Sequence, residues 1–246
     1  MRTVGLARAL SKLGYCSRSQ AQQLIRSGCV RVNGGVKRNP EAPVRLGRDR
    51  IEVKGASIRA AAKVYWMLNK PRGLVTTASD EKDRPTVYST LSDDAPWIAP
   101  VGRLDKASEG LLLLTNDSEW GARVQAPETH LLKTYHVHVS GVRDLELTNA
   151  LTKGLRVSNG DFLRVKEARI LRRGDHNTWL EVALDEGKNR HIRRMLEQLG
   201  LEVLRLVRVA IGPVTLGDLA KGASRPLTAK EKSAIDAAMR APAETG

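Results

Sequence analysis

The stretch "PVGRLDKASEGLLLLTND", residues Pro100 to Asp117, joins a glycine-bracketed charged loop to a run of four leucines. The leucines followed by "TND" predict a buried strand that ends in a turn. The loop before them places Asp105 between Arg103 and Lys106. From spacing, Asp105 is either a turn residue paired with one of these cations or a reactive carboxylate at the end of an element, where functional sites are often built.

Outward from this stretch, strand-like and helical segments alternate irregularly. Many predicted strands are followed directly by another strand, which favours an α+β fold with a mixed, mainly antiparallel sheet flanked by helices over a doubly wound parallel sheet. The predicted strands are 64–68, 110–117, 134–141, 162–173, 178–184 and 203–212, and the predicted helices are 118–125, 144–154, 188–200 and 228–239.

The first fifth of the chain has a different pattern. Leu6, Leu10 and Leu13 follow helical spacing up to Gly14, and Ser17 is placed to cap a second helix. Short alternating strands follow around an Asn33-Gly34 turn signal. We therefore predict a helical-hairpin and strand domain at 1–56, a linker at 57–63, a larger domain at 64–240 and a flexible tail at 241–246.

Charge concentrates in that first domain. The 246-residue chain has a formal net charge of +14, and residues 1–56 hold 12 Lys/Arg against 3 Asp/Glu. A solvated surface would carry interspersed acids, whereas a strong excess of cations attracts a polyanion such as RNA. The residues expected to bind RNA in this domain are Arg18, Arg26, Arg31, Lys37 and Arg38.

The sequence favours a cytoplasmic protein that does not bind or span a membrane. Its longest apolar runs fall far short of the ~20 residues of a spanning helix. Cys16 and Cys29 cannot form a metal site by themselves, and no nucleotide or zinc motif is present, so we expect neither metal nor cofactor. His136 and His138 share a strand face and are interpreted as ordinary strand histidines.

The segment "LARALSKLGYCSRSQAQQLIRSGCVRVNG" resembles the RNA-binding domain first described in ribosomal protein S four, through its two helices, its "SR" turn and its "VRVNG" hairpin. The resemblance implies docking on structured RNA through phosphate and shape contacts, a role that positions the protein and reads little sequence.

Five further segments in order, "LNKPRG", "PVGRLDKASEGLLLLTND", "KTYHVHVSG", "EGKNRHIRRML" and "RVAIGPVTLGDLAKGASRPLT", resemble the RsuA/RluB/RluE/RluF branch of the pseudouridine synthases. The resemblance implies the pseudouridine synthase fold and isomerisation of a uridine in ribosomal RNA without a cofactor. It places the catalytic role on Asp105, an active-site role on Tyr135, and the cation that keeps Asp105 ionised on Arg193.

The resemblance also implies that Arg103 displaces the target base or holds RNA. Other cations at the ends of predicted elements are interpreted as phosphate contacts, with a solvated surface as the alternative: Lys70, Arg72, Lys188, Arg190 and Arg194. We expect a monomer whose partner is ribosomal RNA or a ribosomal assembly intermediate. Transfer RNA as the substrate, and an RNA-binding factor without catalysis, remain alternatives.

Overall fold

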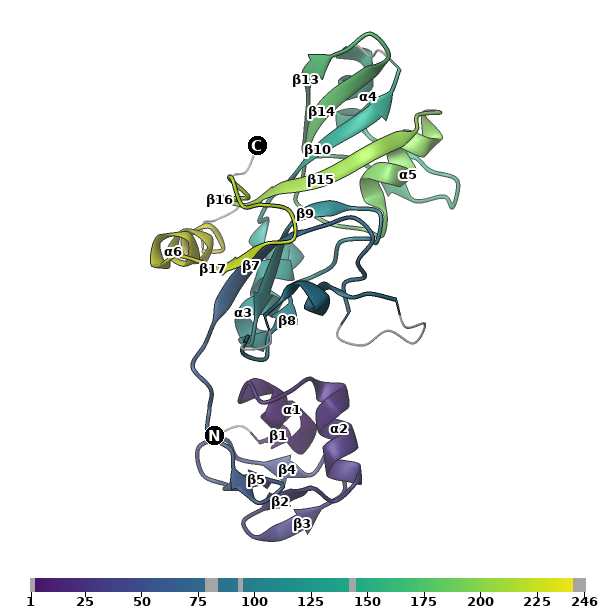
Figure 1. Cartoon of the computed structure of the whole chain (residues 1–246). Coiled ribbons are helices and arrows are strands. Elements are labelled where there is room, and N and C mark those ends of the chain that lie inside the picture. The colour runs from purple at the N-terminus through teal and green to yellow at the C-terminus, as the bar shows by residue number, and fades with distance from the viewer. Residues whose placement is uncertain (1–2, 78–83, 93–94, 142–144, 241–246) are drawn as a thin grey trace. The chain divides into compact units, whose positions relative to one another are not determined.

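The computed structural model describes residues 3–77, 84–92, 95–141 and 145–240 (Figure 1). The chain forms two compact units: residues 1–65 with 92–99 and 114–121, and residues 66–91, 100–113 and 122–246. The tail predicted at 241–246 lies outside the described residues.

The N-terminal helical hairpin forms as predicted. Helix α1 (Leu6–Lys12) is followed by α2 (Arg18–Arg26), and Ser17 caps the second helix. The Ser17 hydroxyl accepts a hydrogen bond from the backbone N–H of Gln20 at 3.1 Å, while the Gln20 side chain accepts one from the N–H of Ser17 at 3.0 Å. This reciprocal pair satisfies two backbone donors that the helix itself leaves free.

A small sheet completes this domain. Strands β2 (Val30–Val32), β3 (Gly35–Lys37), β5 (Ile51–Val53) and β6 (Ala56–Ser57) pair in the order β3-β2-β5-β6, and β1 (Val4–Gly5) pairs with β4 (Pro43–Val44). Asn33 and Gly34 both have positive φ, 50° and 82°, as a tight hairpin turn requires. Because β6 pairs with β5 and Ile58 packs on the domain core, the predicted linker at 57–63 begins too early.

A larger sheet follows the order β13-β14-β10-β15-β9-β7-β17, with β16 beside β15 and β8 beside β9. The pairs β13/β14, β14/β10, β10/β15, β15/β16 and β7/β17 are antiparallel, whereas β15/β9 is parallel. The predicted mixed, mainly antiparallel sheet is thus confirmed. The strands are β7 (Tyr65–Lys70), β8 (Ala99–Pro100), β9 (Glu109–Thr115), β10 (Lys133–Ser140), β13 (Glu167–Arg173), β14 (Asn177–Leu184), β15 (Val203–Ile211), β16 (Val214–Thr215) and β17 (Ser224–Pro226).

The segment predicted as one strand at 162–173 is divided in the structure. Its first residues form β12 (Phe162–Leu163), which pairs with β11 (Leu155–Arg156), and β13 begins at Glu167. Leu163 and Val165 are both buried in the core. The chain therefore pairs with β11 first and joins the large sheet, beside β14, only from Glu167.

Four helices of the described ranges accompany the large sheet: α3 (Ser118–Gln125), α4 (Leu145–Lys153), α5 (His191–Gln198) and α6 (Ala229–Ala238). Short 3-10 turns lie at Val87–Thr90 and Pro127–Thr129. Helices α4 and α5 cover one face of β13, β14, β10 and β15 (Figure 1), where Leu151 and Met195 pack with Val137, Leu180 and Val182. Since side chains alternate along a strand, the odd-numbered residues of β10 face this covered side.

Within the described residues, no helix combines the length and the apolar character needed to cross a membrane.

Candidate active site

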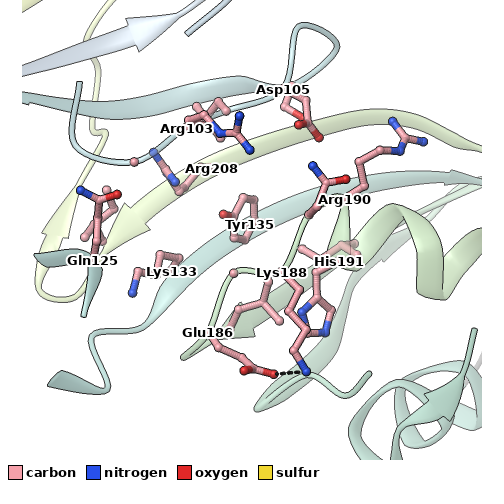
Figure 2. A pocket seen from close by; sticks show the side chains of 18 of the residues that line it. Arg103, Asp105, Gln125, Lys133, Tyr135, Glu186, Lys188, Arg190, His191 and Arg208 are labelled. Atoms are coloured by element: carbon pink, nitrogen blue, oxygen red, sulfur yellow. Dashed lines mark ion pairs between the residues drawn. The ribbon is translucent and has the colours of Figure 1, made fainter. Parts of the chain in front are cut away.

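Three of the charged segments singled out in the sequence meet at one pocket of about 460 Å³ (Figure 2). The loop before β9 contributes Arg103 and Asp105, strand β10 contributes Tyr135, and the segment before α5 contributes Lys188 and Arg190. The lining side chains labelled in Figure 2 are Arg103, Asp105, Gln125, Lys133, Tyr135, Glu186, Lys188, Arg190, His191 and Arg208. The fold thus brings together residues that lie far apart in the sequence.

Asp105 lies at the edge of this pocket on a short loop held by a buried strand. Residues Leu111 to Leu114 of β9 are fully buried. Their burial holds β9 in place, and the loop that carries Asp105 leads directly into this strand. The backbone carbonyl of Asp105 accepts a hydrogen bond from the N–H of Ser108 at 2.9 Å, so the loop closes as a turn. Within the described residues the Asp105 carboxylate has no ion pair, so it is not tied to Arg103 or Lys106.

Lys70 anchors the same loop from inside the protein. Its side chain is fully buried, and its ammonium donates hydrogen bonds to the carbonyl oxygens of Pro71 at 3.1 Å, Asp105 at 3.1 Å and Ser108 at 2.8 Å. Burial lowers the pKa of Lys70 to about 8, against the opposing influence of Asp105 and Glu109. The prediction that Lys70 contacts RNA phosphate is therefore wrong, because an ammonium enclosed by three carbonyls cannot reach a phosphate.

Arg193 on α5 lies behind the loop and is 7% exposed. Its guanidinium donates to the carbonyl oxygen of Ala107 at 3.0 Å and to that of Val203 at 3.5 Å. Burial lowers the pKa of Arg193, and the nearby charge of Asp105 opposes that shift. The two charges therefore interact through space, while the direct hydrogen bonds of Arg193 go to backbone carbonyls.

Tyr135 lies on the floor of the pocket, on the covered face of β10. In Figure 2 it lies between Asp105 on one side and Lys133 on the other. Its neighbours across the sheet are Val182 on β14 and Arg208 on β15. Tyr135 is partly exposed, so its ring is available to a ligand in the pocket.

The other predicted RNA contacts fall into two groups. Arg72, Arg103, Lys188 and Arg190 are exposed in the unit that holds the pocket, and Arg190 also pairs with Glu197 at 2.7 Å. Arg194 instead pairs with Asp161 at 2.6 Å, and its side chain is 19% exposed. In the N-terminal domain all five predicted residues are exposed, namely Arg18, Arg26, Arg31, Lys37 and Arg38.

Two pocket cations were missed by the sequence interpretation, Lys133 and Arg208. Lys133 precedes Tyr135 by two positions on a strand, so the alternation of side chains could have placed both on one face. Arg208 could not have been found in this way, because its place opposite Tyr135 depends on the pairing register of β10 and β15. That register includes an irregularity between Thr134 and Tyr135.

Comparisons with known proteins identify a family for each of two parts of the sequence. The family described as RNA pseudouridylate synthase matches residues 64–198, and the S4 domain family matches residues 4–51. A ribosomal large subunit pseudouridine synthase B of Bacillus subtilis is 36% identical over 227 residues, which cover 92% of this chain and 93% of that protein. An uncharacterized RNA pseudouridine synthase of Rickettsia felis is 38% identical over 226 residues, covering 92% of this chain and 97% of the relative.

A solved structure supports the same assignment. The crystal structure of a pseudouridylate synthase superposes with a TM-score of 0.66 at 29% identity, and the match covers 94% of this chain and 99% of that one. The family matches and the fold therefore define an RNA pseudouridine synthase with an attached S4 domain. This chain belongs to the RNA pseudouridine synthase family.

Proposed function

We propose that this enzyme converts a specific uridine of ribosomal RNA to pseudouridine, with Asp105 as the catalytic residue and without a cofactor. The observation that carries the proposal is the Asp105 carboxylate, without an ion pair among the described residues, at a pocket whose floor is Tyr135. The name of the Bacillus subtilis relative favours large-subunit RNA as the substrate. The cytoplasm and a monomeric state remain predictions.

The reaction breaks the bond between N1 of the base and C1′ of the sugar, turns the base, and joins C5 to C1′. A carboxylate serves this chemistry either by adding to C1′ or by accepting the proton from C2′. Both routes need Asp105 ionised. Arg193 supports this role because a guanidinium stays charged when buried and interacts with Asp105 through space.

Tyr135 and Arg103 complete the proposed site. The ring of Tyr135 offers a surface on which the target base stacks, and its hydroxyl can take part in the late proton transfer from C5. Arg103 is exposed and lines the pocket, and in this proposal it fills the space that the extruded uridine leaves in the RNA. Arg72, Lys188 and Arg190 supply exposed cations for phosphates in the same unit.

The test uses ribosomal and transfer RNA transcribed without modifications. After incubation with the full chain, pseudouridine is mapped by carbodiimide adducts and primer extension. We expect one site in large-subunit RNA with the wild-type protein and none with Asp105→Asn, while Asp175→Asn, an exposed carboxylate outside the pocket lining, acts as the matched control. A site on transfer RNA alone would overturn the substrate, and undiminished activity of Asp105→Asn would overturn the catalytic role.

A further inference from the structure

Arg208 is a buried cation in the pocket with a free donor. Its side chain is 5% exposed, and its Nε donates to the carbonyl oxygen of Leu111 at 2.7 Å. Its Nη2 is buried and has no hydrogen-bond partner among the described residues. Because an unpaired buried donor is costly, this nitrogen is suited to an acceptor that enters the pocket.

Lys133 is a second cation that lines the same pocket. Its ammonium donates one long hydrogen bond, to the carbonyl oxygen of Asp185 at 3.5 Å. Burial and, to a smaller extent, the charge of Arg208 lower the pKa of Lys133 to about 8, and the charge of Asp185 opposes the shift. Two cations that repel each other inside one pocket are stabilised when a negatively charged group binds between them.

Buried apolar side chains form part of the surroundings of the two cations. Leu184, Leu206 and Ile211 line the same pocket and are all buried. The backbone of Arg208 is held against Gly110 of β9 by the parallel pairing of the strands. Rigid donors in apolar surroundings stabilise charge more strongly than mobile side chains in water.

The position of Lys133 and Arg208 beside Tyr135 indicates which part of the substrate they bind; this step rests on the proposed function. In Figure 2 Asp105 lies on one side of Tyr135, and Lys133 and Arg208 lie toward the other. A uridine with its sugar at Asp105 and its base against Tyr135 would therefore point the far edge of its uracil ring toward the two cations. That edge carries carbonyl oxygens, which are acceptors for a guanidinium or an ammonium.

Negative charge develops on the base during the reaction. When the N1–C1′ bond breaks, its electron pair stays on N1, and C1′ is satisfied by the Asp105 carboxylate or by loss of the C2′ proton to it. The charge of the released uracil anion is shared with its O2 and O4. The ring then bonds C1′ through C5 as the carboxylate leaves C1′ or returns the proton to C2′, the C5 proton leaves, and N1 takes up a proton, so no atom or electron is gained overall.

We propose that Arg208 and Lys133 form a subsite that binds the uracil ring through its carbonyl oxygens and stabilises the negative charge on the departing base. A phosphate is the competing ligand for two cations. The burial of Arg208, the partial burial of Lys133 and the place of both beside Tyr135 favour the base, since the exposed Arg72, Lys188 and Arg190 are the groups suited to phosphates.

The experiment measures single-turnover rates on large-subunit RNA transcribed with either uridine or 5-fluorouridine. Fluorine stabilises the uracil anion, so it reduces the need for help from the protein. The variants are Arg208→Met, Lys133→Met and the charge-conserving Lys133→Arg, with Arg169→Met as the control because Arg169 is exposed and pairs with Glu181 outside the pocket lining. C5 of 5-fluorouridine carries no proton, so its rearranged nucleoside keeps the fluorine. Chromatography of the digested RNA separates each rearranged nucleoside from its precursor.

For uridine we expect each Met variant to react about 10²-fold more slowly, as when one preorganised donor is removed. The loss should be clearly smaller with 5-fluorouridine, Lys133→Arg should recover most of the rate, and RNA affinity should stay unchanged. Equal losses on both RNAs together with weaker RNA binding would indicate a phosphate site and overturn the proposal, as would unchanged rates. If Arg208→Met does not fold, the rates of Lys133→Met and Lys133→Arg on the two RNAs test the proposal by themselves.

These outcomes are separate from a failure of the proposed function. If the wild-type protein forms no pseudouridine on ribosomal RNA, the proposed function is wrong. If the wild-type protein is active and the Met variants react like the control, the subsite alone is wrong.

Discussion

Gly110 on β9 lies against the backbone of Arg208 on β15, where a Cβ added to the glycine would stand 2.2 Å from the Arg208 carbonyl oxygen. Gly110 also has a φ of 102°, a conformation that residues with a side chain rarely adopt. The close approach of the loop strand to the strand that carries Arg208 therefore depends on a glycine at this position.

We predict that Gly110→Ala destabilises the protein by about 3 kcal/mol, because the new methyl group would meet backbone that cannot move aside. Denaturant unfolding measures the change. Gly217→Ala is the control, since its φ is also positive but its added Cβ would meet open space. Equal losses in the two variants would show that backbone conformation, and not the proximity of Arg208, sets the cost.

Lys70→Met should lower kcat by about 10²-fold or more with little change in KM, because a loop displaced by about 1 Å loses its reactive geometry. The ammonium of Lys70 is buried and does not reach the RNA, so the variant should bind RNA as well as the wild-type protein does. Steady-state kinetics check this split. Lys106→Met, in the same loop but exposed, is the control, and a rise in KM without a fall in kcat for Lys70→Met would contradict the anchoring role.

The arginines of the N-terminal domain should determine the salt dependence of RNA binding. Replacing Arg18 and Arg31 by Gln should reduce the slope of log affinity against log salt by about 1 for each phosphate that the protein no longer neutralises. Filter binding over a salt series measures the slope. Arg50→Gln is a matched control from the same domain, because Arg50 is paired with Glu52 at 2.7 Å. An unchanged slope in the double variant would argue against phosphate binding by these arginines.

Deletion of residues 1–56 should raise the Michaelis constant more than it lowers kcat, since the domain positions the RNA and contributes no side chain to the pocket lining. Kinetics on large-subunit RNA compare the full chain with the shortened one. Equal RNA affinity for both chains would contradict this role of the domain.

Glu231 should make α6 sensitive to acid. Its carboxylate accepts hydrogen bonds from Arg225 at 2.8 Å and 2.6 Å and from the Thr228 N–H at 2.7 Å, and Arg225, the largest cause, lowers its pKa to about 2. The folded-state pKa lies below the ordinary 4.5, so this stabilisation is present above pH 4.5 and lost as the pH falls toward 2.

Glu231→Gln should therefore reduce the free energy of unfolding by about 1 kcal/mol at neutral pH, and the difference from wild type should vanish near the folded-state pKa. Urea unfolding followed by circular dichroism at several pH values tests this. A difference independent of pH would mean that the ionised carboxylate is not the stabilising group.

Local signals in the sequence predicted most of the fold. Ser17 with Gln20 defines a helix start, and Asn33-Gly34 defines a hairpin, because each depends on neighbours within a few residues. The run at 162–173 was misjudged for a physical reason. Its apolar and basic residues suit a strand throughout, and the change of partner after Leu163 comes from packing in the core.

The site was predictable only in part. Asp105 and Tyr135 were located by their motifs, and the pocket brings them together. Lys70 was misassigned because a lysine is usually exposed, although it occupies the same inward side of β7 as the buried Leu68. Arg208 could not be found because only the register of β10 and β15 places it beside Tyr135.

The anchoring of the Asp105 loop by Lys70 also bears on how such an enzyme can change over evolution. The ammonium binds carbonyl oxygens, which every residue possesses, so it places no demand on the side chains at positions 106 and 107. Natural selection can therefore replace those two side chains to suit another RNA without loosening the loop that carries the aspartate.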